Sequence, residues 1–402
     1  MENPTVGENN LQIKIQDSRK KLLRSIPTNT FEQTTYPYLN DDNIGKPIPL
    51  AYGEIRNASV ICTNEDEPPA VTYSFKLADV SDHTNGIKSI DTVYVENVTV
   101  IPNATDLTNA TFTITSASGD YTAGDNVTCD FSGYVDDGDN LIENAHDIIA
   151  DIMDIYADQP FISDIFNTSH WDRNKSPDII LYLDAKKKII DVIGDITSNA
   201  ILGTFNVEDD GRYALRIFDK NAASLNTLLR TDLESTPAVN YNNTKVISST
   251  VIGYNKDFDE GEYRLLEDKS QESDIFTKFR IYNEEEFDTF LKNSTAAQTF
   301  SDTILEYSGD VEATFTLSTG YEFINRELGD IITVQLRRAN ASFIGNVKCE
   351  IIGKTYDLSR HMLQYKCRIF EYVQDTYFNH AAMYNDNFYN DGFYGKNIAR
   401  VI

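Results

Sequence analysis

Residues 185–219 have the sequence AKKKIIDVIGDITSNAILGTFNVEDDGRYALRIFD, in which the spacing of the apolar residues changes once. The first half carries apolar residues three and four positions apart, which is the spacing of one helical face: Ile189, Ile190, Val192, Ile193, Ile196 and Ala200. We expect Asp184 to be the N-cap of this helix. The second half alternates as strands with one buried face do: Leu202, Phe205 and Val207, then Tyr213, Leu215 and Ile217.

The dipeptide Asp210-Gly211 stands between the two alternating runs. It predicts a hairpin closed by a type I′ turn, because that turn needs a positive φ at both central residues. A helix followed at once by a hairpin fits a part of any α+β domain. The stretch therefore predicts a fold class and, by itself, no function.

Composition limits the classes of function. The 402 residues predict two or three domains, and 41% hydrophobic residues suffice for their cores. Asp and Glu number 63 against 35 Lys and Arg, so the net charge is −28. Such a surface repels phosphate backbones, which disfavours nucleic-acid binding through a basic face.

One basic cluster departs from this acidic background near the N-terminus. Arg19, Lys20, Lys21 and Arg24 are interleaved with apolar residues within 19–26, and the cluster predicts either a short docking helix or a solvated face. No apolar run approaches the roughly 20 residues of a membrane span, and the chain begins without a signal-peptide pattern. We expect a soluble chain made in a cytoplasm, with its four cysteines reduced and partly buried.

Periodicity along the rest of the chain predicts mostly strands. Residues 55–135 alternate repeatedly and predict a small antiparallel sheet or barrel, with turns at 85–86 and 118–119. A helix is expected to begin at Asn140, with Glu143 in a capping-box position, and to end before Asp158. A second helix is expected over 287–307, and further strands are expected at 179–183, 246–254, 263–266, 311–317, 331–336, 347–356 and 362–372.

These elements predict an α+β chain with several β-rich domains and a mixed helix-plus-hairpin domain. We divide it into five segments: a polar N-terminal arm at 1–44, a β-rich domain at 45–138, a mixed α/β domain at 139–235, an α+β domain at 236–376, and an aromatic and Asn-rich tail at 377–402.

The sequence contains none of the catalytic or nucleotide-binding motifs considered below. None of the five histidines stands in HExxH or beside a cysteine, and the glycine motifs of nucleotide-binding loops are missing. The acidic run Asp136-Asp137-Gly138-Asp139 lacks the spacing and the closing glutamate of an EF-hand, which favours an ordinary loop before a helix. The sequence nominates no catalytic, cofactor-binding or metal residue, and we expect a non-enzymatic protein without a cofactor.

Several stretches occur in the order that is typical of bacteriophage tail and baseplate hub proteins. The segment 46–53 (KPIPLAYG) is similar to their Pro-Ile-x-Tyr-Gly segment, and Asn144, Ala145, Ile148 and Ile149 resemble the opening of their helix. The helix and hairpin of 188–218, the strands of 251–263, the turn of 328–334 (LGDIITV) and the hairpin of 347–368 follow in the same order. The resemblance covers about residues 45–375 as an ordered set of weak motifs.

This resemblance implies a structural component of a phage tail tip or baseplate, located in the virion tail and made in the host cytoplasm. Such hub proteins form rings on the tail axis, most often trimers, and contact other tail proteins. DNA would pass through an acidic lumen without specific binding, since like charges repel. The alternatives are a receptor- or carbohydrate-binding tail component and a cell-wall hydrolase of the tail, and the hydrolase lacks a catalytic motif.

Two kinds of residue remain as candidate sites. Asp210, Gly211, Gly329 and Asp330 are expected to be structural turn residues, because glycine adopts a positive φ and aspartate caps a turn through its side chain. The tail is expected either to contact a partner or to pack on its own chain through its aromatic residues: Tyr384, Phe388, Tyr389, Phe393 and Tyr394.

Overall fold

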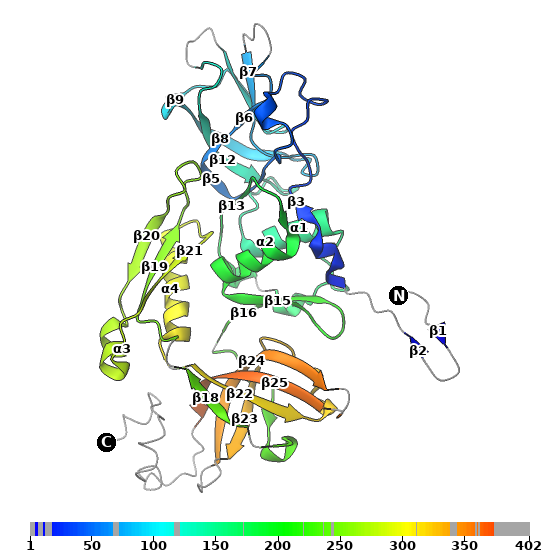
Figure 1. Cartoon of the computed structure of the whole chain (residues 1–402), viewed down its shortest axis with the longest axis vertical. Helices are drawn as coiled ribbons and strands as arrows, with labels where there is room; N and C mark the ends of the chain where they lie inside the picture. The colour runs from blue at the N-terminus through cyan, green and yellow to red at the C-terminus, as the bar shows by residue number, and fades with distance from the viewer. Residues whose placement is uncertain are drawn as a thin grey trace. The chain divides into compact units, whose positions relative to one another are not determined.

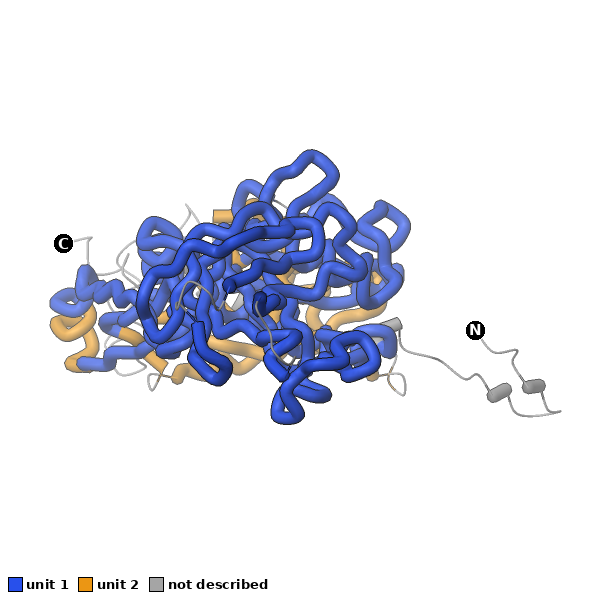
Figure 2. The backbone as a smooth tube through the Cα atoms, turned by 90° about the horizontal axis from the view of Figure 1, so that it is seen from above, with its two compact units in different colours: residues 1–217, 248–274, 282–305 blue, residues 218–247, 275–281, 306–402 orange. Residues whose placement is uncertain are grey.

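The structure is a computed structural model that describes residues 5–6, 11–12, 18–66, 72–115, 121–171, 173–219, 221–235, 237–242, 245–310, 312–337, 344–357, 360 and 362–373. The chain divides into two units (Figure 2). Unit 1 comprises residues 1–217, 248–274 and 282–305, and unit 2 comprises residues 218–247, 275–281 and 306–402. The described residues form several separate sheets and few helices (Figure 1), which confirms the predicted α+β class.

The β-rich part of unit 1 contains two four-stranded antiparallel sheets. One has the order β5-β12-β8-β9: β5 Glu54–Ser59, β12 Val127–Tyr134, β8 Ile87–Val95 and β9 Val98–Val100. The other has the order β10-β11-β7-β6: β10 Ala104–Asp106, β11 Thr111–Thr115, β7 Thr72–Lys76 and β6 Ile61–Cys62. The strands predicted for 55–135 are confirmed, and the predicted turn at 118–119 lies outside the described residues.

Two helices and three strand pairs follow in unit 1. The helices are α1 Ala145–Ala157 and α2 Ile189–Ile196, which continues into the π-helical turn Thr197–Ile201. The pairs are β13 Leu181–Leu183 with β4 Leu50–Tyr52, β14 Lys187–Lys188 with β3 Ser25–Ile26, and the hairpin of β15 Gly203–Val207 with β16 Tyr213–Ile217. β1 Thr5–Val6 pairs with β2 Leu11–Gln12.

The apolar stripe that predicted α2 is largely buried, with Ile189, Val192, Ile193 and Ile196 at most 1% exposed. The predicted N-cap is wrong, because Lys188 and not Asp184 caps this helix. Lys187 and Lys188 pair with β3 in an extended conformation, so the backbone cannot become helical before Ile189. Periodicity located the buried face, whereas a strand partner from the N-terminal segment determined where the helix begins.

The start predicted for α1 is also wrong. Asn144 is the N-cap, and its side chain accepts a hydrogen bond from the backbone N–H of His146. The chain before it is extended, because Ile142 donates to the carbonyl of Tyr134 and Leu141 bridges Val135. The predicted end is confirmed, since the C-cap residue Asp158 has a left-handed backbone.

The last part of unit 1 is a three-stranded sheet of order β20-β19-β21 with a helix against one face. β19 Ser249–Tyr254 pairs antiparallel with β20 Arg264–Asp268 and parallel with β21 Glu284–Asp288, and α4 spans Ser294–Ser308. The helix predicted for 287–307 is therefore wrong in its first turns. Phe287 belongs to β21, and the side chain of Asn293 caps α4 by accepting from the N–H of Ala296.

Unit 2 is built on a six-stranded sheet of order β17-β23-β24-β25-β22-β18. Its strands are β17 Thr227–Leu228, β23 Ile331–Arg337, β24 Ile344–Asp357, β25 Met362–Val373, β22 Glu312–Thr319 and β18 Val239–Asn242. Alternate residues of these strands form one buried cluster that includes Phe315, Ile332, Val347 and Tyr365. The four strands predicted between 311 and 372 are confirmed.

Short helices complete the described chain: α3 Glu272–Phe279 and the 3-10 helices η1 Ser18–Leu23, η2 Asp41–Asn43, η4 Thr168–His170, η5 Arg173–Lys175, η7 Arg230–Asp232 and η8 Tyr321–Phe323. No helix in the described part of the chain is long and apolar enough to cross a bilayer. All four cysteines are free and buried, and burial raises the pKa of Cys62 to about 11. The division into five segments remains a prediction.

Candidate functional site

The turn between β15 and β16 contains Asp210 and Gly211. The N–H of Gly211 donates to the carbonyl of Glu208 at 2.9 Å, and the N–H of Glu208 donates to the carbonyl of Arg212 at 2.8 Å. Gly211 has φ +86°, and it is the only residue of this turn with a positive φ among those described. The loop therefore has three residues and needs a left-handed backbone only at its last position, so the type I′ prediction is wrong.

Asp210 stabilises this turn through its side chain, without the positive φ that a type I′ turn would require of it. Its carboxylate accepts from the backbone N–H of Arg212 at 2.9 Å and from Nε of the same residue at 2.7 Å. These hydrogen bonds lower the pKa of Asp210. An aspartate that binds the backbone two residues ahead stabilises a turn without a positive φ of its own.

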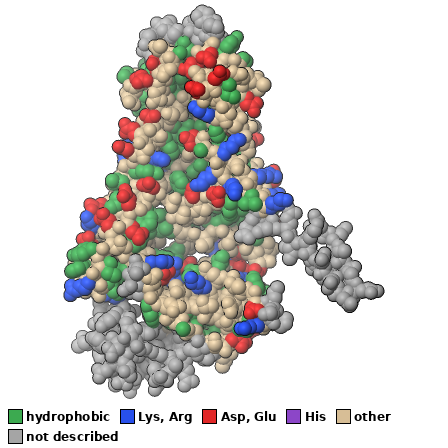
Figure 3. Space-filling view, in the orientation of Figure 1, with side chains coloured by type: hydrophobic (Ala, Val, Ile, Leu, Met, Phe, Trp, Pro, Cys, Tyr) green, Lys and Arg blue, Asp and Glu red, His purple; other side chains and the backbone are tan. Residues whose placement is uncertain are grey.

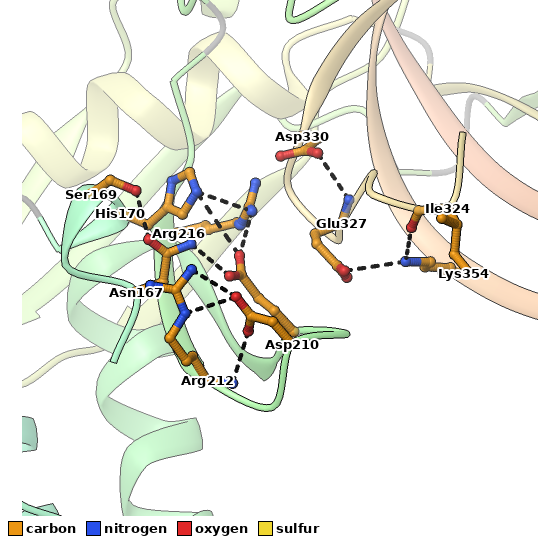
Figure 4. A network of polar contacts seen from close by, with 11 residues as sticks. Asn167, Ser169, His170, Asp210, Arg212, Arg216, Ile324, Glu327, Asp330 and Lys354 are labelled. Carbon is orange, nitrogen blue, oxygen red and sulfur yellow. Dashed lines mark hydrogen bonds and ion pairs between the residues drawn. The ribbon is translucent and has the colours of Figure 1, made fainter. Parts of the chain in front are cut away.

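A buried ion pair lies beside this turn (Figure 4). Arg216 Nη2 donates to Oε1 of Glu208 at 2.5 Å, and Asn167 Nδ2 donates to Oε2 of the same carboxylate at 2.6 Å. His170 Nε2 lies 3.2 Å from Arg216 Nη2. The side chains of Glu208 and Arg216 are only 6% and 9% exposed. Because both charges are paired and hydrogen-bonded, the network holds the η4 loop against the hairpin.

The Gly329-Asp330 turn of unit 2 also combines a glycine of positive φ with an aspartate that accepts a backbone hydrogen bond. Gly329 has φ +84°, and its N–H donates to the carbonyl of Ile351 in β24. Asp330 is 3% exposed and accepts from the N–H of Glu327 at 2.9 Å. Lys354 of β24 donates to the carbonyl of Ile324 and to Oε1 of Glu327 (Figure 4). These contacts position the start of β23 beside β24.

A buried histidine–aspartate contact was missed by the sequence analysis. His83 Nε2 lies 2.9 Å from Oδ2 of Asp151, and the same oxygen accepts from the hydroxyl of Tyr52 at 2.7 Å. The ring of His83 stacks on Tyr134 with centroids 3.6 Å apart. Burial, with a further contribution from Asp151, raises the pKa of Tyr52.

The cluster of His83, Asp151 and Tyr52 contains residue types that can perform acid–base chemistry, but it is buried as a structural contact is. The His83 side chain is 3% exposed and Tyr52 is fully buried. The contact ties α1 to β4 and to the loop after β7. Asp151 is 68 positions from His83 and 99 positions from Tyr52 in the chain, so no local sequence pattern could have predicted these contacts.

The acidic loop before α1 uses its oxygens internally. Asp136 Oδ1 accepts from the backbone N–H groups of Asn140 and Gly138, and these hydrogen bonds lower the pKa of Asp136. In the described ranges no group of three or more His, Cys, Asp or Glu side chains is arranged to hold a metal ion.

The tail residues Tyr384, Phe388, Tyr389, Phe393 and Tyr394 lie outside the described residues. Of the residues nominated from the sequence, the structure places Asp210 with Gly211 in one turn of unit 1, and Gly329 with Asp330 in one turn of unit 2. The charged groups of the polar clusters beside them are paired within the protein, as Glu208 is with Arg216 and Glu327 is with Lys354.

Comparison with known proteins gives a fold and no family. No protein-family model and no curated protein matches the chain. Among solved structures, a chain in the virion of a native gene transfer agent particle is similar with a TM-score of 0.56 and 11% identity, over 88% of this chain and 92% of that chain. The two chains therefore share a fold.

Two bacterial tail proteins also match, with lower structural similarity. A tail protein from Neisseria meningitidis has a TM-score of 0.36 at 10% identity, over 81% of this chain and 96% of that one. A 43 kDa prophage tail protein from Shewanella oneidensis has a TM-score of 0.34 at 10% identity, over 80% of this chain and 97% of that one.

Proposed function

We propose that this chain is a structural component of a bacteriophage tail tip or baseplate, where it forms a hub ring at the end of the tail. The observation that carries the proposal is the fold that it shares, over 88% of its length, with a chain of a gene transfer agent virion. The order of weak motifs along 45–375, which resembles that of hub proteins, supports the same assignment independently of the structure.

The polar chemistry of the chain agrees with a structural role. The ionised groups with the least exposure are engaged in contacts within the protein, as Glu208 is with Arg216 and Asn167. We propose that the chain has no catalytic activity, that it is made in the host cytoplasm and that it is incorporated into the virion tail.

The partners that we propose are further copies of this chain, most often three, and neighbouring tail proteins. With a net charge of −28, a ring of such chains would give DNA an acidic lumen to slide through without binding. The alternative is a receptor- or carbohydrate-binding tail component, which would lie at the periphery of the tail.

The position of the chain in assembled particles tests the proposal. An epitope inserted between Ala123 and Gly124 suits this purpose, because Ala123 is exposed and no heavy atom lies within 4 Å of a Cβ added at Gly124. We expect antibody label at the tail end, on the axis, in electron micrographs of whole particles. Label on peripheral fibres would favour the receptor-binding alternative, and particles without label would contradict both. The same epitope on a capsid protein is the control for labelling efficiency.

A further inference from the structure

The three-stranded sheet of unit 1 has one covered and one open face. α4 covers the face that contains Thr250, Ile252 and Phe287: Ser301 contacts Thr250 at 2.7 Å, and the Phe300 ring lies 6.1 Å from that of Phe287. The alternate residues therefore point to the opposite face. The register places these residues there: Val251, Leu265, Glu267, Glu284, Glu286 and Asp288.

This open face, hereafter the acidic sheet face, combines carboxylates with exposed apolar surface. Leu265 is 61% exposed, and Glu267 and Glu284 have side chains that are 56% and 49% exposed. Glu286 and Asp288 are exposed as well. Lys269 pairs with Glu267 and Glu284, so one cation faces four carboxylates. The face keeps an excess of negative charge around an uncovered leucine.

A second cation marks one end of this face. Lys256 lies 5.5 Å from the centroid of the Tyr263 ring. The Tyr263 side chain lies over Gly253 on the same face, since a Cβ added at Gly253 would be 3.0 Å from Cγ of Tyr263. Burial, together with Asp288, raises the pKa of Tyr263. The excess charge of the face therefore lies toward β21 and the Glu267 end of β20.

The opposite charge gathers on another part of unit 1. Two short segments, η1 with Arg24 and the turn leading into β14, are brought together by the pairing of β3 with β14. Figure 3 shows Lys and Arg side chains clustered on the flank where η1 lies in Figure 1. We define the lysine surface by these residues: Lys20, Lys21, Arg24, Lys186, Lys187 and Lys188.

Part of this positive charge is uncompensated within the chain. Arg24 pairs with Asp158, and Lys187 pairs with Asp195. Lys20, Lys186 and Lys188 are exposed and have no ion pair with any residue that the structure describes. Leu23 beside them is 55% exposed. The lysine surface is thus complementary to the acidic sheet face: each has an exposed leucine among charged side chains, and the charges of the two surfaces have opposite signs.

The two surfaces lie on different flanks of the same unit (Figure 1), so they cannot meet within one chain. We infer that the lysine surface of one copy docks on the acidic sheet face of the next copy. The inference rests on the proposed function as a ring-forming tail protein. A contact between two different surfaces of identical chains is head-to-tail, and head-to-tail contacts generate a ring when the rotation closes.

Charge balance favours a second copy over other occupants of the lysine surface. Copies that each carry −28 repel one another except where opposite charges face each other, so a local match determines which surfaces meet. A nucleic acid would meet a few cations surrounded by this acidic field, which is unfavourable for a phosphate backbone.

Charge reversal tests the contact on the full-length chain. The variant K186E/K188E reverses the lysine surface, E267K/E286K reverses the acidic sheet face, and a fourfold variant carries both reversals at unchanged net charge. We expect each double variant to associate at least tenfold more weakly than the original chain in sedimentation velocity at one fixed ionic strength. We expect the fourfold variant to recover association, because it restores opposite charges across the same contact.

The matched control is E32K/D42K, which changes the net charge as E267K/E286K does at two exposed residues of unit 1 outside both surfaces. It should associate like the original chain, and the fluorescence of Trp171 should show that every variant is folded. If the original chain associates and the reversals have no effect, or if the fourfold variant fails to recover, the contact is refuted while the proposed function stands. If the original chain stays monomeric at every concentration, with and without other tail proteins, both the contact and the ring are refuted.

Discussion

Replacing Arg216 with methionine should cost unit 1 about 3–5 kcal/mol of its free energy of unfolding. The guanidinium is the cation that faces Glu208 at 2.5 Å, and the Glu208 side chain is only 6% exposed. Methionine keeps much of the volume but leaves the carboxylate buried, with a hydrogen bond from Asn167 Nδ2 and with His170 Nε2 3.9 Å away. Removing one partner of a buried pair costs more than the pair itself contributes, because the other charge stays desolvated.

Trp171 makes this loss measurable at the site. It is the only tryptophan of the chain, it is 7% exposed, and its ring lies 5.0 Å from Phe166 and 6.4 Å from Phe205 of the hairpin. Its fluorescence therefore reports the unfolding of the part of unit 1 that contains the ion pair. At about 2–4 °C per kcal/mol for a unit of roughly this size, the melting temperature should fall by about 6–20 °C.

The exposed pair Asp210–Arg212 in the same hairpin is the matched control, because its side chains are 47% and 34% exposed. Arg212→Met should cost no more than about 1 kcal/mol. The double variant E208L/R216M should recover most of the stability lost in R216M, since no buried charge remains unpaired. A loss in R216M no larger than that in R212M would show that the buried pair is not what holds this hairpin.

Three further predictions concern the turn, the tail and the absence of catalysis. Gly211→Val should lower the free energy of unfolding of unit 1 by about 1 kcal/mol or more, because a β-branched residue resists φ +86° although space for its Cβ is free. Gly211→Asn should be tolerated better. An unchanged urea midpoint for the valine variant would contradict the turn geometry. Deleting 378–402 should leave a cooperative melt of the core and weaken association with copies or partners, and aggregation of the truncated chain would instead place the tail in the core. The purified chain should give no lysis band in zymograms of peptidoglycan or polysaccharide, with lysozyme as the positive control, and a clear band would refute the non-enzymatic assignment.

Local periodicity predicted what depends on local burial. The stripe from Ile189 to Ile196 and the alternation of 331–336 and 362–372 each describe which side of an element lies in a core, and the structure buries those sides. Such patterns need only one apolar environment, whichever residues provide it. For this reason the four long strands of unit 2 were predicted from sequence alone, whereas the short strands β17 and β18 were not.

Element ends failed where a distant strand determines them. Lys187 and Lys188 are extended because they pair with Ser25 and Ile26 of β3. Phe287 is a strand residue because β21 pairs in parallel with β19. The sequence near these positions contains no pattern that indicates the distant strand partner. The helical spacing that includes Phe287 is real, but parallel pairing of β21 with β19 outweighs a preference of a few tenths of a kcal/mol per residue.

The type of the hairpin turn failed for a related reason. Asp-Gly is compatible with a two-residue and a three-residue loop, and the length of the loop decides which residue needs a positive φ. Here the register places Val207 opposite Tyr213, and the hydrogen bond from the N–H of Glu208 to the carbonyl of Arg212 leaves the three-residue loop 209–211. The buried contact of His83 with Asp151 was beyond sequence reasoning altogether, since its residues share no spacing.

The gene transfer agent chain shares its fold with this chain at only 11% identity, so most exposed residues of this chain are particular to its own sequence. A fold tolerates extensive exchange of core residues as long as their volume and pattern are kept, so 11% identity suffices to specify the same sheets and helices. Exposed charges are under no such constraint, because most surface substitutions change stability by less than about 0.5 kcal/mol. The lysine surface and the acidic sheet face are therefore not consequences of the fold. If both surfaces form a contact between copies, the charges of one surface must be complementary to those of the other. The fourfold variant, which reverses the charges of both surfaces together, tests this complementarity.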